Sequence, residues 1–171
     1  MANNGAITSL INSGTIAAAA GSSGIQNQGT IAALTNAAGA EIAGVTAAID
    51  NDGSIGTLSN SGTLSGADAG VVNAGAIGAI VNDGSINGLS NLGTIGSSSQ
   101  PTAIWNKAGG MLDFIDNGLG AAISGATSAI SNDGTIDTVS NSGTISSDGT
   151  GITNSGSIGT LDNAANAAMS G

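Results

Sequence analysis

The stretch Ile7-Thr-Ser-Leu10-Ile-Asn12-Ser-Gly-Thr-Ile16 contains a short motif that recurs through the whole chain of 171 residues. The motif reads Asn, any residue, Gly, then Thr, Ser or Ala, then Ile or Leu. Its occurrences include those that begin at Asn12, Asn27, Asn51, Asn60, Asn73, Asn82, Asn91, Asn132, Asn141 and Asn154. Recurrence at this frequency identifies a repeat protein, so the fold is derived from the period of the repeat.

The spacing between successive asparagines alternates. From Asn3 the intervals are 9, 15, 9, 15, 9 and 13 residues up to Asn73, and from Asn132 they are 9, 13 and 9 residues up to Asn163. One full period is therefore 22 or 24 residues. A 15-residue interval resembles nine residues plus six, which predicts three short extended segments and three corners in each period, a triangular coil.

Local propensity favours strands over helices. The chain has 30 glycines, and each costs about 1 kcal/mol relative to Ala inside a helix, whereas Ile after Gly favours a short strand. Stacked coils pair their backbone groups with the coils above and below. We therefore predict an all-β, single-domain parallel β-solenoid over residues 1–171, a right-handed β-helix. It should have about seven triangular coils of 22–24 residues and a length of roughly 30 to 35 Å.

Each motif position has a predicted role. The aliphatic residues should point inward and stack in columns, with the members Ile7, Ile16, Ile31, Ile55, Leu64, Ile77, Ile86, Ile95, Ile136, Ile145 and Ile158. The asparagine tolerates left-handed geometry at a corner, and the glycine two residues later supplies a positive φ. Asparagines in register should form an amide ladder. Its predicted rungs are Asn3, Asn12, Asn27, Asn36, Asn51, Asn60, Asn73, Asn82, Asn132, Asn141, Asn154 and Asn163.

The rhythm changes between Asn73 and Asn132, where the intervals are 9, 9, 15, 11 and 15 residues. We predict an irregular coil or insertion around residues 96–120, which contains Trp105, Lys107 and Phe114. We expect the two aromatic residues to fill a locally wider core or to pack against a bulged loop. The alternative is that Trp105, Lys107 and Phe114 form a contact site for another molecule.

The composition argues against catalysis and against nucleic-acid binding. The chain has no His, Cys, Tyr or Arg, one Lys, 11 acidic residues and a formal net charge of −10. An imidazole base, a thiolate nucleophile and a His or Cys metal site are therefore excluded, and one cation cannot neutralise phosphates. We expect no enzyme, no cofactor, no metal and no nucleic-acid partner. With 40% hydrophobic and 7% charged residues, the chain can bury a core and is not disordered.

Two polar positions have a functional alternative. Asp52, Asp83 and Asp133 occupy the middle of Asn-x-Gly, where we expect them to keep the rod soluble and to block lateral sheet pairing. Calcium binding is the alternative, although no known calcium loop occurs. The threonines of Gly-Thr-Ile suggest an ice-binding face, but Ala and Ser interrupt the row, for example at Ala6 and Ser54. This interruption favours a structural threonine column.

The Asn-x-Gly-Thr-Ile and Ile-x-x-Leu-x-Asn runs resemble the repeat tracts of bacterial autotransporter passengers and related large surface adhesins, over nearly the whole chain. The resemblance implies a right-handed, pectin-lyase-like β-helix with an extracellular or cell-surface role and no enzymatic activity. No secretory signal is visible in residues 1–10. No stretch reaches the roughly 18 to 20 apolar residues of a membrane helix, so we expect no membrane insertion.

The ends of the solenoid decide the expected function. A terminal coil exposes unpaired N–H and C=O groups unless a polar cap covers it, and the repeat leaves only a short Ala-rich tail at 164–171. We therefore expect a non-enzymatic structural protein that polymerises head to tail into extracellular filaments, as a surface fibre or biofilm-matrix component. The alternatives are a monomeric adhesin or autotransporter passenger fragment that binds a cell-surface or glycan receptor and, third, an ice-binding protein.

Overall fold

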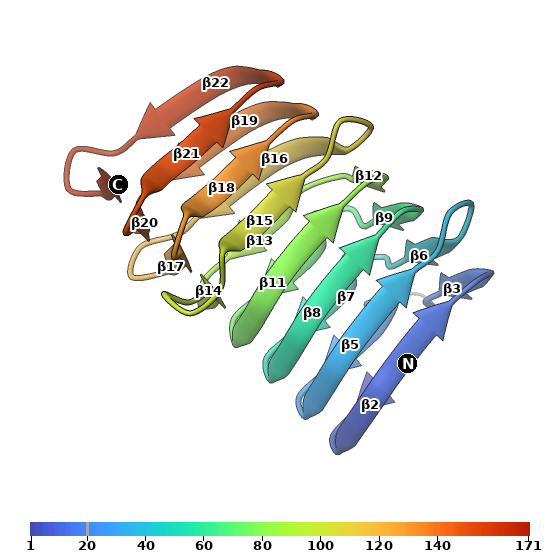
Figure 1. Cartoon of the computed structure of the whole chain (residues 1–171). Coiled ribbons are helices and arrows are strands. Elements are labelled where there is room, and N and C mark those ends of the chain that lie inside the picture. Colours follow the sequence, from blue (N-terminus) through green and yellow to red (C-terminus); the bar gives the residue numbers. More distant parts are fainter. Residues whose placement is uncertain (20) are drawn as a thin grey trace.

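The structure, a computed structural model, describes residues 1–19 and 21–171, and these residues form strands but no helix. Every strand pair is parallel. The chain winds into one β-solenoid with its N-terminal turn at one end of the stack and its C-terminal turn at the other (Figure 1). Asparagines in register from Asn3 to Asn163 mark seven turns. The prediction of a single-domain parallel β-solenoid is therefore confirmed, while its right-handed winding stays a prediction.

The strands form two sheets. Sheet A contains β1 (Ala2–Asn3), β3 (Thr15–Ala17), β4 (Ile25–Asn27), β6 (Glu41–Ala43), β7 (Ala47–Asn51), β9 (Thr63–Ser65), β10 (Ala69–Asn73), β12 (Ser85–Ile86), β13 (Leu89–Asn91), β16 (Met111–Asn117), β19 (Thr135–Asn141) and β22 (Ser157–Asn163). Sheet B contains β2 (Ala6–Asn12), β5 (Thr30–Asn36), β8 (Ser54–Asn60), β11 (Ala76–Asn82), β14 (Thr94–Gly96), β15 (Thr102–Asn106), β17 (Ala122–Gly125), β18 (Ser128–Asn132), β20 (Thr144–Ser147), β21 (Thr150–Asn154) and β23 (Ala168–Ser170).

The repeating element is a half-turn, the segment from one corner asparagine to the next. A straight half-turn is a single seven-residue strand, such as β2 or β22, and it fills a nine-residue interval. A split half-turn, such as β3 with β4, has the same inward residues but contains a connection between its two strands. Each turn joins one half-turn in sheet A to one in sheet B.

Each turn from Asn3 to Asn163 has three strands, as the triangular coil predicts, for example β2, β3 and β4 in the first turn and β20, β21 and β22 in the last. The strands β16, β19 and β22 then span both strand positions of sheet A without a break, because β16 pairs with β12 through its first residues and with β13 through its last. Sheet A therefore contains two of the three strand positions of the early turns, and the strands are joined into two sheets.

The central segment exchanges the two kinds of half-turn between the sheets. Up to β12 the straight half-turns lie in sheet B, as β2, β5, β8 and β11, whereas β16, β19 and β22 are straight strands of sheet A. The exchange occurs where β11 pairs with β14 at Ile77 and with β15 at Ile80, because residues 97–101 are inserted between these two strands. The irregularity predicted around 96–120 is thus a change in which sheet carries the connection, and the solenoid continues through it.

Four aliphatic columns form the core. They begin at Ile7, Leu10, Ile16 and Ile25, and each continues through residues in register one turn apart. Of the eleven predicted core residues, Ile7, Ile16 and Ile158 are partly buried in the end turns and the other eight are fully buried. The eleven named residues do not include members of the columns that begin at Leu10 and Ile25, although Leu10 belongs to the motif whose aliphatic residues were expected to point inward.

The motif glycines serve close stacking. A Cβ on Gly53 would overlap the carbonyl oxygen of Gly29 in the turn below, and one on Gly75 would overlap that of Gly53. Positive φ occurs only at Gly21, Gly39, Gly88, Gly96 and Gly120 among the described residues. The motif glycines are not among these, so the expected left-handed corner with a positive-φ glycine is wrong. Glycine is required at this position because the corners of successive turns approach too closely to accommodate any side chain.

Candidate functional site

Two asparagine ladders run the length of the solenoid, one at each corner where the sheets meet. Ladder one contains Asn3, Asn27, Asn51, Asn73, Asn91, Asn117, Asn141 and Asn163. Ladder two contains Asn12, Asn36, Asn60, Asn82, Asn106, Asn132 and Asn154. In both, Nδ2 donates to Oδ1 one turn later over 2.6 to 2.9 Å. The predicted amide ladder is confirmed, as two ladders.

All twelve predicted rungs lie in these ladders, and the structure adds Asn91, Asn106 and Asn117. Asn106 and Asn117 have no glycine two positions later, and the intervals around them are irregular. A sequence pattern that could have identified these two rungs lies just before them. Ile104 and Ile115 stand two residues before the asparagines, as Leu10 stands two residues before Asn12.

Each ladder is polar along the solenoid axis. At the N-terminal end, Oδ1 of Asn3 and of Asn12 accept only from the backbone N–H of their own corner, at 3.2 Å. At the C-terminal end, Nδ2 of Asn154 and of Asn163 donate only to a carbonyl of their own corner, at 3.3 Å. Within the described residues, one end thus presents two amide acceptors and the opposite end two amide donors.

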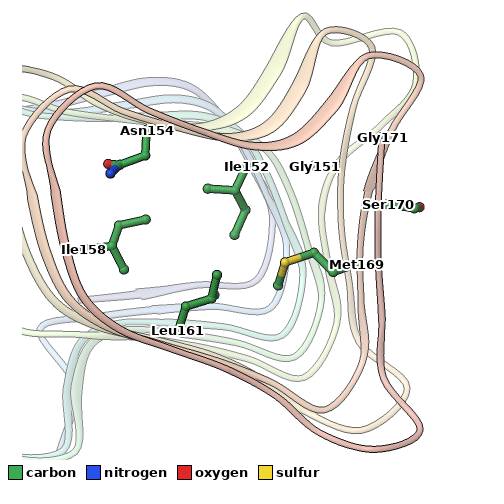
Figure 2. Close-up of a pocket in the computed structure, with 8 residues that line it drawn as sticks. All are labelled: Gly151, Ile152, Asn154, Ile158, Leu161, Met169, Ser170 and Gly171. Carbon is green, nitrogen blue, oxygen red and sulfur yellow. The ribbon is translucent and has the colours of Figure 1, made fainter.

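Core side chains lie open at both ends. At the N-terminal end Ile7, Leu10 and Ile16 are only partly buried, and Met1, in line with the Ile25 column, is 45% exposed. The C-terminal end has a hollow of about 480 Å³ that is lined by four apolar side chains. Figure 2 shows these side chains pointing into one opening, namely Ile152, Ile158, Leu161 and Met169. This hollow is the uncovered end of the core, and Leu161 is 49% exposed in it.

Strand edges are also uncovered at the two ends. The strands β1, β2 and β3 each pair on one side only, as do β21, β22 and β23. The Ala-rich segment predicted as a tail at 164–171 includes β23, which pairs with β20 as a further strand of sheet B. It covers β20, its end at Ser170 and Gly171 lies against Thr150 and Gly151 of β21, and no described strand pairs with the outer edges of β21 and β22.

A second hollow, of about 510 Å³, lies beside Trp105 on the outer surface of sheet B. The indole is 41% exposed, its Nε1 donates to Oδ2 of Asp133 at 2.9 Å, and Nζ of Lys107 lies 5.2 Å from the ring centroid. Trp105 therefore does not fill the core, because its position on β15 alternates with the inward Ile104. Gln100 and Pro101, in and at the end of the inserted loop, line the same hollow as the indole.

Phe114 is separate from Trp105. It lies on β16 in sheet A, where its half-buried ring covers the position at which Gly88 would carry a side chain. The three predicted contact residues thus divide into a pair, Trp105 with Lys107 on the sheet B surface, and a packing residue, Phe114.

The carboxylates do not gather into a candidate metal centre in the described part of the chain. Asp52 and Asp83 are exposed at corners, and Asp133 accepts the indole hydrogen bond. Burial raises the pKa of Asp50, and repulsion from Asp52 raises that pKa further. No helix in residues 1–19 and 21–171 is long and apolar enough to cross a membrane.

The threonine row predicted from Gly-Thr-Ile is mixed. In sheet B successive turns place Ala6, Thr30, Ser54, Ala76, Thr94, Ala122, Thr144 and Ala168 in register. Threonine occupies fewer than half of these positions, so hydroxyl and methyl groups do not repeat regularly along the sheet.

The two open ends are the most distinctive sites of the molecule, followed by the hollow beside Trp105. Compared with known proteins, the chain matches no protein-family model, no curated protein and no solved structure.

Proposed function

We propose that the protein is a structural subunit that stacks head to tail with copies of itself into filaments. The observation that carries the proposal is the complementarity of the two ends. Both ends expose core side chains, while the ladders end in acceptors at one end and donors at the other. Uncovered strand edges recruit further strands, and covering apolar side chains contributes about 25 cal/mol per Å².

The polarity of the ladders favours open assembly. Two N-terminal ends placed together would face acceptor against acceptor, and two C-terminal ends would face donor against donor. Only an N-terminal end on a C-terminal end continues the amide hydrogen bonds. Such a heterologous contact does not close on itself and therefore generates a filament rather than a dimer.

The net charge and the amino-acid composition are consistent with a filament subunit. A net charge of −10 opposes lateral association of filaments at neutral pH, whereas the end faces are apolar and amide-lined. We propose a non-enzymatic fibre or matrix component outside the cell or on its surface, in line with the resemblance to autotransporter and adhesin repeats. The scaffold uses no disulfide, because the chain has no cysteine.

Two end variants test the proposal. Leu10→Asp places a charge in the N-terminal end face, and Leu161→Asp places one in the C-terminal end face. Each should abolish filaments in negative-stain electron microscopy, while an equimolar mixture should form heterodimers only, because each variant keeps one functional end. Ser9→Asp, an outward position on the same strand β2, is the matched control and should still form filaments.

Two results would contradict the proposal. Wild-type protein that stays monodisperse and monomeric at every concentration in light scattering contradicts head-to-tail stacking. Filaments that persist in both Leu10→Asp and Leu161→Asp would place the contact elsewhere on the molecule.

A second candidate function is binding of a receptor or glycan by a monomer. The half-exposed Trp105 beside a hollow with the polar residues Gln100, Ser131 and Asp133 favours this alternative. Because Trp105 is the only tryptophan, its fluorescence reports occupancy of this hollow. Saturable quenching by a glycan library, together with loss of the calorimetric binding signal in Trp105→Ala, would support binding, and no quenching would count against it.

A further inference from the structure

We propose that successive copies in the filament are related by close to a half-turn about the solenoid axis, so that one split half-turn is shared between two molecules. This inference rests on the proposed head-to-tail stacking and specifies its register. The shared half-turn would consist of β23 from one copy and β1 from the next. The argument uses the order of the ladder rungs, the lengths of the edge strands and the positions of the open core residues.

The rung order restricts the possible registers. The C-terminal end finishes with Asn154 in ladder two and then Asn163 in ladder one, whereas the N-terminal end begins with Asn3 in ladder one and then Asn12 in ladder two. If Asn3 of the next copy stacked on Asn163, its Asn12 would stand two rungs above Asn154. One rung would then be missing, and only one ladder would continue.

Rotation by a half-turn removes this gap. Asn3 of the next copy then stacks on Asn154, and its Asn12 stacks on Asn163. Both C-terminal donors meet N-terminal acceptors, and the nine-residue interval from Asn3 to Asn12 lies on the nine-residue interval from Asn154 to Asn163. Both ladders therefore run through the junction.

The strand edges match in the same register. The straight strand β2 (Ala6–Asn12) lies on the straight strand β22 (Ser157–Asn163), with seven residues in each. The short strand β3 lies on β23, and β1 lies on the outer edge of β21, with which no described strand pairs. Without the rotation, β2 would have to lie across β23 and β21, which differ by one turn in height.

The open core residues match one to one. By the register of the ladders, Ile7 of the next copy meets Ile158, and Leu10 meets Leu161. Likewise Met1 meets Ile152, and Ile16 meets Met169. These eight residues are the partly buried or exposed apolar side chains of the two end turns, so each column gains the neighbour that it lacks.

The inference gives a definite helical symmetry. Fifteen half-turns, from the one that begins at Asn3 to the shared one, make seven and a half turns for each copy. At about 4.8 Å for each turn, the rise per subunit is about 36 Å, with a rotation close to a half-turn.

Disulfide cross-linking tests the register because the chain has no cysteine. In the rotated register Asp162 lies beside Ile11 of the next copy, and without rotation Asp162 lies beside Ala2. Neighbouring parallel strands place Cα atoms about 4.8 Å apart, within the disulfide range of about 4.4–6.8 Å. All three residues are exposed, so the substitutions leave the core intact.

The experiment mixes Asp162→Cys filament subunits with Ile11→Cys subunits or with Ala2→Cys subunits under mild oxidation. Mass spectrometry should find the heterodimer with Ile11→Cys at several times the yield of the heterodimer with Ala2→Cys. A higher yield with Ala2→Cys, or a cryo-electron microscopy rotation near zero, overturns the register while head-to-tail stacking stands. Protein that forms no filaments and no heterodimer in either mixture overturns both proposals.

Discussion

Asn117→Ala tests whether the ladders stabilise each molecule at a rung in the irregular segment. The buried Asn117 amide accepts from Nδ2 of Asn91 at 2.8 Å and donates to Oδ1 of Asn141 at 2.8 Å and to the carbonyl of Thr144 at 3.1 Å. Alanine removes all three bonds. Nδ2 of Asn91, in the turn below, keeps only the backbone carbonyls of Gly93 and Ala122 as acceptors, and Oδ1 of Asn141, in the turn above, loses its donor. An unsatisfied buried group costs about 1 to 3 kcal/mol and each further lost hydrogen bond about 1 kcal/mol, so we expect a loss of about 3 to 5 kcal/mol in the free energy of unfolding.

Urea unfolding followed by circular dichroism measures this loss, in the Leu10→Asp background so that assembly does not contribute. Asp116→Ala changes the exposed neighbour on the same strand and should stay within about 0.5 kcal/mol of the reference. Asn163→Ala should cost less than Asn117→Ala, because Asn163 accepts one ladder bond and donates none to another turn. An Asn117→Ala midpoint equal to that of Asp116→Ala, with an unchanged slope, would refute a stabilising role for the ladder.

Three further predictions concern other sites. Gly88→Ala should lower the free energy of unfolding by about 1 to 3 kcal/mol, because Gly88 has a φ of +138° and a Cβ would overlap the Phe114 ring. Thermal unfolding should show a smaller loss when Gly88→Ala is combined with Phe114→Ala than when it is made alone. Asp50→Asn should raise the melting temperature at pH 7, because burial and Asp52 raise the pKa of Asp50 above its ordinary 3.8. The stability associated with protonated Asp50 is complete below pH 3.8 and is lost as the pH rises through the raised pKa, so wild type and variant should converge at pH 3 in calorimetry. Trp105→Ala should leave filament formation unchanged in electron microscopy, because the indole lies on the outer face of sheet B, away from both ends; loss of filaments would place a contact at Trp105.

The period of the sequence was sufficient to predict the solenoid and most ladder rungs. Alternating nine-residue and longer intervals encode the two half-turns of each turn, since parallel stacking places equivalent residues in register. Asn106 and Asn117 escaped the motif because neither has glycine two positions later, and the intervals around them are irregular. Their Ile-x-Asn sequences still place an inward aliphatic residue two positions before the amide, as β15 and β16 confirm.

The features that were not predicted depend on contacts between neighbouring turns, and the sequence of a single period does not show these contacts. The motif glycines were assigned a positive φ from turn statistics, but the carbonyl of the turn below imposes the requirement at Gly53. Trp105 was expected either to fill a locally wider core or to pack against a bulged loop. Its alternation with Ile104 on β15 places it outside, so the two-residue strand period outweighs hydrophobicity at that position.

The central segment has a physical role in the proposed filament. Consecutive nine-residue intervals from Asn73 to Asn82 and Asn91 shift the phase of the repeat by one half-turn, so that straight strands move from sheet B to sheet A. Had the phase stayed constant, the half-turn below β2 of the next copy would be split, and a seven-residue strand would lie on two shorter strands with a connection between them. The shift instead places the straight strand β22 at that position, where it matches β2 in length, in its inward residues and in its asparagine. In the proposed filament, the irregularity of the repeat therefore places two straight strands of equal length against each other at the junction, whereas inside the molecule the straight strand β11 pairs with the separate strands β14 and β15.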